Sequence, residues 1–168
     1  RVLALAPKLG DKLARRPALL DALIEPRFAV PLSQDAPGAR LAELRQRLDE
    51  ADSFETKLNT ARRFHREEAV RIAVQILEQS ATAEQAGAAY ADLAETCVIG
   101  MADAALAEVE RQNGPQPGSF TILALGKFGG RELAEDSDLD LMLVFDAPSE
   151  NASPSDFYTR LTQRLISA

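Results

Sequence analysis

Apolar residues recur at intervals of three and four along the first two-thirds of this 168-residue chain. This spacing places apolar side chains on one side of a helix, so it predicts a helical region over residues 1–114. Thr82 and Gln85 stand at the spacing of a capping box, which marks a helix start. We expect two or three short helices over 2–24, a loop over 31–38, a helix with an apolar stripe at Leu41, Leu44 and Leu48, a long amphipathic helix over 54–76 and an alanine-rich helix from 82 to about 112.

The periodicity changes after the turn-forming stretch 113–118, which reads NGPQPG. Residues 119–125 and 138–145 are short apolar runs typical of strands, and we expect them to be neighbours in one sheet. A helix start follows, with Ser153 as the cap and Pro154 in the first turn. Helices followed by strand, loop, strand and helix predict the α+β class: a helical region over 1–114, then the start of an α/β domain over 115–168.

Two carboxylates, Asp138 and Asp140, stand where the second of these strands begins. Residues two apart on a strand point to the same face, so both carboxylates project together while Leu139 and Leu141 face the other way. Ionising both carboxylates at close range is unfavourable without a counter-charge. A pair of Mg²⁺ ions supplies that charge, and two such ions would clamp the attacking and leaving oxygens of a phosphoryl displacement. We therefore interpret the pair as metal ligands.

A glycine pair, Gly129 and Gly130, lies in the loop between the two strands. We expect these glycines to adopt unusual backbone angles and to approach a ligand closely, with consecutive N–H groups forming a nest for an anion. Lys127 and Arg131 flank the pair with positive charge. The loop therefore predicts a phosphate cradle beside the acidic pair. The alternative is a glycine hairpin with surface acids.

The composition limits which partners and which cellular compartment we expect. The formal net charge of −7 argues against nucleic acid, because proteins that bind it neutralise phosphates with basic surfaces. No apolar stretch is long enough to span a membrane, and the N-terminus lacks a signal-peptide pattern. The single cysteine, Cys97, excludes an internal disulfide and fits a reducing, cytoplasmic setting. Its alanine-rich surroundings predict a packed thiol rather than a nucleophile.

Arginines surround the only histidine, His65, on the long predicted helix. Such a run of charges typically forms a solvated face, and the alternative is that one of the arginines reaches a bound phosphate. The arginines are Arg62, Arg63 and Arg66. Tyr90 and Tyr158 fall on predicted helices, and we interpret both as packing residues.

The segment 124–145, ALGKFGGRELAEDSDLDLMLVF, resembles the nucleotidyltransferase superfamily that includes DNA polymerase β. More narrowly, it resembles the bifunctional glutamine synthetase adenylyltransferase/adenylyl-removing enzymes, whose signature is G-K-[LF]-G-G-x-E-[LM] followed by S-D-[LI]-D-L. The stretches 13–24 and 62–77, LARRPALLDALI and RRFHREEAVRIAVQIL, are similar to the helical region that precedes such a domain. The resemblance thus covers most of the chain.

This resemblance implies a truncated polymerase β-like nucleotidyltransferase domain over 115–168. By matching position, Asp138 and Asp140 would be the catalytic metal ligands. The nucleotide triphosphate would be bound by Gly129, Gly130, Ser137 and Lys127. Asp136 departs from the small or polar residues expected at its place. The family places a third carboxylate on a later strand, so we expect it beyond Ala168 and expect the fragment alone to be inactive.

The function implied by the resemblance is the transfer of AMP from ATP to a tyrosine of glutamine synthetase, with Mg²⁺ as cofactor, in the regulation of nitrogen assimilation. The helices before the domain favour this adenylylating half of the enzyme. The first alternative is the deadenylylating half, which removes AMP with phosphate and releases ADP. The second is a non-catalytic module that binds glutamine synthetase or the PII signalling protein.

Overall fold

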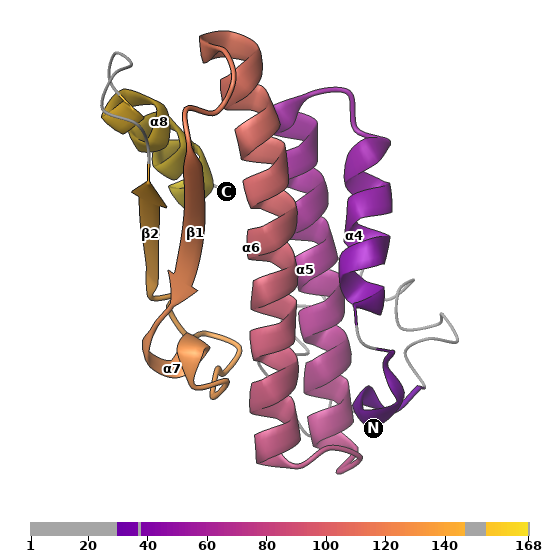
Figure 1. The fold of residues 1–168 in the computed structure, drawn as a ribbon. Coiled ribbons are helices and arrows are strands. Elements are labelled where there is room, and N and C mark those ends of the chain that lie inside the picture. The colour runs from indigo at the N-terminus through magenta and orange to yellow at the C-terminus, as the bar shows by residue number, and fades with distance from the viewer. Residues whose placement is uncertain (1–29, 37, 147–153, 168) are drawn as a thin grey trace.

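The computed structural model describes residues 30–36, 38–146 and 154–167. The short helices predicted over 2–24 and the predicted cap Ser153 lie outside the described residues. Helices α4, α5 and α6 form a bundle, and the sheet and α8 lie on the other side of α6 (Figure 1). This arrangement is a helix-dominated α+β fold, as predicted. The elements are η2 (Leu32–Gln34), α4 (Ala39–Asp49), α5 (Phe54–Leu77), α6 (Ala83–Asn113), β1 (Ser119–Ala124), α7 (Gly126–Gly129), β2 (Leu141–Asp146) and α8 (Pro154–Ile166).

The helix boundaries follow from capping residues. The Ser53 hydroxyl accepts a hydrogen bond from the Thr56 N–H group and starts α5. The predicted capping box at the start of α6 is confirmed, because Thr82 Oγ1 accepts from the Gln85 N–H group and Gln85 Oε1 accepts from the Thr82 N–H group. Helix α6 ends at Gly114, whose φ of +88° is costly for other residues.

The alanine-rich helix α6 packs closely against its neighbours, as predicted. Leu44 and Leu48 of α4 are buried against it. A Cβ atom at Gly100 of α6 would lie 3.0 Å from Cδ2 of Leu44, so glycine permits this close approach of the two helices. Phe64 and Ile72 of α5 have no exposed surface and complete the core of the bundle.

The predicted loop over 31–38 contains one 3-10 turn, η2, and leads into the bundle through a buried ion-pair cluster. Arg71 of α5 contacts Asp35 at 2.7 Å and Glu68 at 3.5 Å. Arg40 of α4 contacts the same two carboxylates at 2.7 Å and 3.0 Å. Glu68 is only 1% exposed, so its charge depends on these two arginines.

Strands β1 and β2 pair antiparallel, with Ser119 opposite Asp146 and Ala124 opposite Leu141. The prediction that these segments are neighbours in one sheet is confirmed. Strand β2 begins at Leu141, later than predicted, so residues 138–140 precede the strand. The pairing nevertheless extends one step further, since the N–H group of Leu125 donates to the carbonyl of Asp140 at 2.9 Å.

One face of the sheet packs on α8 and on the second half of α6. Tyr158 of α8 is 1% exposed, and its ring stacks on Phe145 at 4.3 Å between centroids. Tyr90 of α6 is also buried, so the prediction that both tyrosines are packing residues is confirmed. The opposite face of the sheet exposes Leu123, Met142 and Val144. No helix within the described residues is long and apolar enough to cross a membrane.

Candidate functional site

The acidic pair lies at the start of β2. Asp138 and Asp140 are both exposed. The prediction that the intervening leucines share the opposite side is confirmed, because Leu139, Leu141 and Leu143 all line one cavity between the sheet and the helices. Alternation along the extended backbone then directs the two carboxylates to the open face of the sheet. Their role as metal ligands stays a prediction.

The carboxylate of Asp140 lies directly over the first residue of the glycine turn. Gly126 has a φ of +53°, and a Cβ atom there would lie 2.6 Å from Oδ2 of Asp140. Both facts exclude a larger side chain at this position. Gly126 is not among the predicted site residues, although it is the first glycine of the G-K-F-G-G run. The turn and Asp140 are therefore in contact.

The glycine turn is a short helix, α7, and this corrects two expectations. Gly129 and Gly130 do not adopt left-handed backbone angles: Gly130 has a φ of −78°, and the left-handed residues are Gly126 and Arg131. The N–H groups of Gly129 and Gly130 donate to the carbonyls of Leu125 and Gly126, both at 3.0 Å. The turn uses these two N–H groups itself because its own carbonyls are close by. The N–H groups without an intrahelical acceptor are those at its start, from Gly126 onward.

Gly129 is required by the packing of the turn on β1. A Cβ atom at Gly129 would lie 2.5 Å from the carbonyl oxygen of Ala124, which is too short for a van der Waals contact. A Cβ atom at Gly130 would meet the carbonyl oxygen of Gly126 at 3.4 Å, an ordinary contact. The two neighbouring glycines therefore differ in their structural role.

We expect Gly129→Ala to destabilise the chain by about 1–3 kcal/mol, since the turn must move away from β1 to make room. Gly130→Ala should be neutral or stabilising by up to about 1 kcal/mol, because its backbone angles suit alanine. Urea unfolding of the two variants measures the difference. Equal losses of stability would contradict this assignment.

Two further residues predicted for the site are Lys127, which lies in the turn, and Ser137, which follows it in the chain. Lys127 is exposed on α7, next to Gly126 in the chain. Ser137 is held in a local turn: its Oγ accepts from the N–H group of Ala134 at 2.9 Å, and its own N–H group donates to the Ala134 carbonyl at 3.1 Å. These two hydrogen bonds hold the backbone turn that directly precedes Asp138. Nucleotide binding by Lys127 and Ser137 stays a prediction.

Arg131 does not flank an anion nest, contrary to expectation. Its guanidinium group contacts the carboxylates of Asp92 and Glu95 on α6, the second at 3.3 Å. The hydrogen bond to Asp92 contributes most to raising the pKa of Arg131 above its ordinary value. The physical reason is that two carboxylates, three residues apart on one face of α6, lie within contact distance of the guanidinium group and neutralise its charge. Sequence reasoning missed Asp92 and Glu95, which lie more than 30 residues away along the chain.

The arginines around His65 lie mainly on the helix side of the sheet. Arg62, His65 and Arg66 line the cavity of about 410 Å³ that also contains Leu139, and Arg62 donates to the carbonyl of Ser167 at 2.6 Å. Arg63 is largely exposed beside Glu67. This side is opposite to the face assigned to the acidic pair, which favours a packing and surface role over phosphate binding.

Cys97 is a packed thiol, as predicted. It lies against the core of the bundle, and burial, together with the charge of Glu68, raises its pKa to about 12. A thiol with so high a pKa is not ionised near neutral pH and is a poor nucleophile.

The residues at the start of β2 fit a Mg²⁺ ion that is shared with a substrate. Mg²⁺ prefers oxygen ligands, and in enzymes it is usually held by one or two carboxylates together with substrate phosphates. Asp138 and Asp140 are two exposed carboxylates of this kind. Within the described residues no cluster of three or more histidine, cysteine or carboxylate side chains could hold a metal alone.

The protein has an α+β fold in which a helical bundle is joined to a small sheet. An acidic pair follows a glycine turn in this sheet region. Both the fold class and this motif agree with the sequence pattern. All 168 residues match the family model of the glutamate-ammonia ligase adenylyltransferases. The chain belongs to this family.

Curated relatives agree over nearly the whole chain. A bifunctional glutamine synthetase adenylyltransferase/adenylyl-removing enzyme of Caulobacter vibrioides is 41% identical over 174 residues, covering 99% of this chain and 17% of that protein. Proteins of the same description from Xanthobacter autotrophicus and a Bradyrhizobium species are 40% and 41% identical, with 99% of this chain and 18% of each protein covered. The chain therefore spans less than a fifth of the length of these relatives.

Proposed function

We propose that this chain forms part of a Mg²⁺-dependent adenylyltransferase that moves AMP from ATP to a tyrosine of glutamine synthetase. The observation that carries the proposal is the contact between the Asp140 carboxylate and Gly126 at the start of the turn. It places the Asp140 carboxylate beside the start of the turn, where backbone N–H groups have no intrahelical acceptor, and the two together would bind a metal ion and its phosphate. The relatives are named for this activity, which supports the proposal.

The residues of this chain would each contribute to binding. Asp138 and Asp140 would hold Mg²⁺, which supplies charge stabilisation for the phosphates and the leaving pyrophosphate when bound. Lys127, exposed on the turn, would attract the triphosphate. Gly129 keeps the turn against β1, and so keeps Gly126 under Asp140. The tyrosine oxygen would then bond to the α-phosphorus in line as the bond to pyrophosphate breaks.

Other parts of the site and the partners are proposed from the likeness to the full-length relatives. In a full-length family member, a third carboxylate on another strand would complete the metal site. ATP as substrate, PII as a regulatory partner and the cytoplasm as compartment are part of the same proposal. The relatives are named for both transfer and removal of AMP. We propose transfer for this chain because of the sequence resemblance of the stretches 13–24 and 62–77.

We expect Asp138→Asn, placed in a full-length family member carrying this sequence, to abolish transfer and leave removal active. The transfer assay follows labelled AMP from ATP onto glutamine synthetase with Mg²⁺. The removal assay follows ADP formed from adenylylated glutamine synthetase and phosphate. Because the asparagine removes one ligand charge at nearly unchanged volume, only the reaction of this site should stop. Loss of removal alone would assign the chain to the deadenylylating half, and loss of neither would refute a catalytic role.

A further inference from the structure

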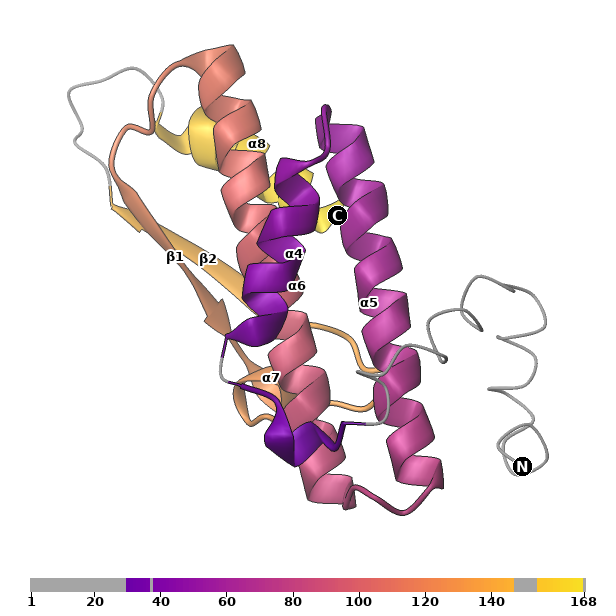
Figure 2. The same ribbon diagram turned by 90° about the vertical axis from the view of Figure 1, so that its right-hand side faces the viewer.

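The loop that carries the glycine turn is docked on the first half of α6. Phe128 and Leu133 are buried in the core of the bundle. The backbone of Arg131 passes so close to α6 that a Cβ atom at Gly87 would lie 3.4 Å from its carbonyl oxygen. Figures 1 and 2 show α7 beside this half of α6 in both views. The position of the turn therefore depends on α6 as well as on β1.

Arg131 occupies an unfavourable backbone conformation at this docking point. Its φ is +58°, in the left-handed region that costs a residue with a side chain roughly 1–2 kcal/mol. Such a conformation persists only where the surroundings hold it. The Arg131 side chain extends to Asp92 and Glu95, and these two ion pairs tie the strained residue to α6.

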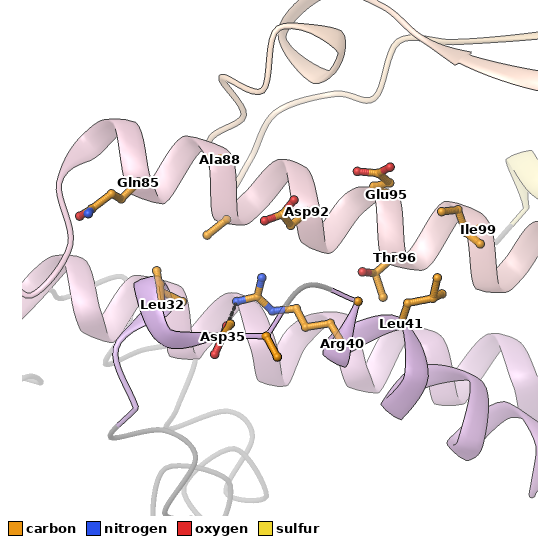
Figure 3. A pocket seen from close by; sticks show the side chains of 13 residues that line it. Leu32, Asp35, Arg40, Leu41, Gln85, Ala88, Asp92, Glu95, Thr96 and Ile99 are labelled. Atoms are coloured by element: carbon orange, nitrogen blue, oxygen red, sulfur yellow. Dashed lines mark hydrogen bonds and ion pairs between the residues drawn. The ribbon is translucent and has the colours of Figure 1, made fainter.

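Among the described residues, Arg40 faces the two acids of α6 across the neighbouring pocket but pairs with other carboxylates. A cavity of about 480 Å³ separates α6 from η2 and α4, and Asp92, Glu95 and Arg40 line it. Figure 3 shows Glu95 pointing away from Arg40, whose guanidinium group faces Asp35. Arg40 contacts Asp35 at 2.7 Å and Glu68 at 3.0 Å. In the part of the chain that the structure describes, Arg131 is the cation paired with Asp92 and Glu95.

We propose that Arg131 is a positioning residue for the adenylyl transfer: its ion pairs to Asp92 and Glu95 hold the glycine turn, and through the turn the acidic pair, in place on α6. This inference rests on the proposed function. Arg131 lies five residues after Gly126, whose Cα atom supports the Asp140 carboxylate. A shift of the loop away from α6 would move Gly126 and release that carboxylate. A small displacement of this kind lowers the rate of a step that requires aligned groups.

The alternative role for Arg131 is direct binding of the triphosphate, with the ion pairs as a resting state. The two roles predict opposite effects when the acids are neutralised. If Arg131 positions the loop, the loss of Asp92 and Glu95 weakens the site. If Arg131 binds phosphate, the same loss releases its guanidinium group and removes nearby negative charge, so ATP affinity rises.

The test compares Arg131→Asn, the double variant Asp92→Asn/Glu95→Gln, and the triple variant in a full-length family member carrying this sequence. Asparagine tolerates the left-handed conformation, so Arg131→Asn removes the ion pairs without adding backbone strain. We expect Arg131→Asn and the double variant each to lower kcat for transfer by about three- to tenfold, the range that one or two exposed ion pairs supply. The KM for ATP should change less than kcat. The triple variant should be no slower than Arg131→Asn.

A lower KM for ATP in the double variant, or a rate in the triple variant equal to the product of the separate losses, would overturn the proposal. The matched control is Arg45→Gln, which removes an exposed contact of similar kind between α4 and Asp103 of α6, at 2.8 Å, away from the loop. We expect its kcat to be unchanged. A loss in this control as large as in Arg131→Asn would mean that kcat reports general destabilisation.

Hydrogen exchange separates this inference from the proposed function. In Arg131→Asn, amides of residues 128–133 should exchange about three- to tenfold faster, while those of α4 and α5 stay unchanged. This readout needs no substrate, so it tests the ion-pair anchor even if the protein proves to have no transfer activity. Unchanged exchange in the loop would refute the anchor itself, whatever the kinetics show.

Discussion

Asp140→Asn should lower the rate of AMP transfer by more than about 100-fold in a full-length family member carrying this sequence. Replacing a residue that only hydrogen-bonds to a metal ligand typically lowers metal affinity or activity by about 10–100-fold. Removing the charge of the ligand itself should therefore lower the rate further. Asparagine keeps the shape of the side chain over Gly126, and the free energy of unfolding should stay within about 0.5 kcal/mol of the parent, as for other exposed positions. Steady-state kinetics at saturating Mg²⁺ and urea unfolding measure the two quantities.

The matched control for this prediction is Asp136→Asn. Asp136 is an exposed carboxylate four residues away that precedes the extended segment, and its replacement changes the net charge equally. Its rate should stay close to that of the parent or rise slightly, because the triphosphate then meets less negative charge. A rate for Asp140→Asn within tenfold of this control would show that Asp140 does not bind the metal.

The largest expected effect on stability is at Arg71, where we expect Arg71→Met to cost about 3–5 kcal/mol. Arg71 is 4% exposed and binds both Asp35 and Glu68, so its removal leaves these two carboxylates with one arginine, Arg40, and the buried cluster with an excess negative charge. Methionine has a similar length and an apolar side chain, and therefore removes the charge with little change in packing. Urea unfolding of the 168-residue chain measures the loss.

A second variant tests the electrostatic origin of this loss. Adding Glu68→Met to Arg71→Met should restore part of the stability, because Arg40 and Asp35 remain paired at 2.7 Å and the cluster no longer carries an excess negative charge. Arg111→Gln, which breaks an exposed pair with Glu108, should cost far less stability than Arg71→Met. A loss of stability that increases in the double variant would point to packing rather than charge.

The helices and strands could be predicted from the sequence, as could the side chains of the second strand that face the helices. Both depend on local periodicity. Leu139 and Leu141 share a side as the alternation requires, and the capping box of Thr82 and Gln85 formed as its spacing indicates. The roles of the glycines could not be predicted, since Gly129 is fixed by its distance to Ala124 and Gly126 by the Asp140 carboxylate. Those distances arise only when β1, the turn and β2 pack together.

The partners of Arg131 were hidden for a related reason. Asp92 and Glu95 stand on a solvated face of α6 by their pattern, and the sequence offers no signal that a loop more than 30 residues later will dock there. The buried cluster of Arg71 and Glu68 was equally hidden, because charges at helical spacing usually face water. Long-range ion pairs thus account for most of what the sequence could not predict.

Helix α6 supports the site loop at one end and the sheet at the other, and this limits how far the parts can be separated. Its 31 residues extend about 46 Å. The first half buries Phe128 and Leu133, and the second half, through Ala105 and Val109, packs with Tyr158 and its neighbours. A piece beginning at residue 115 would carry the acidic pair on a sheet without its apolar support. A catalytic module cut from this protein for transplantation into another scaffold must therefore include the whole of α6.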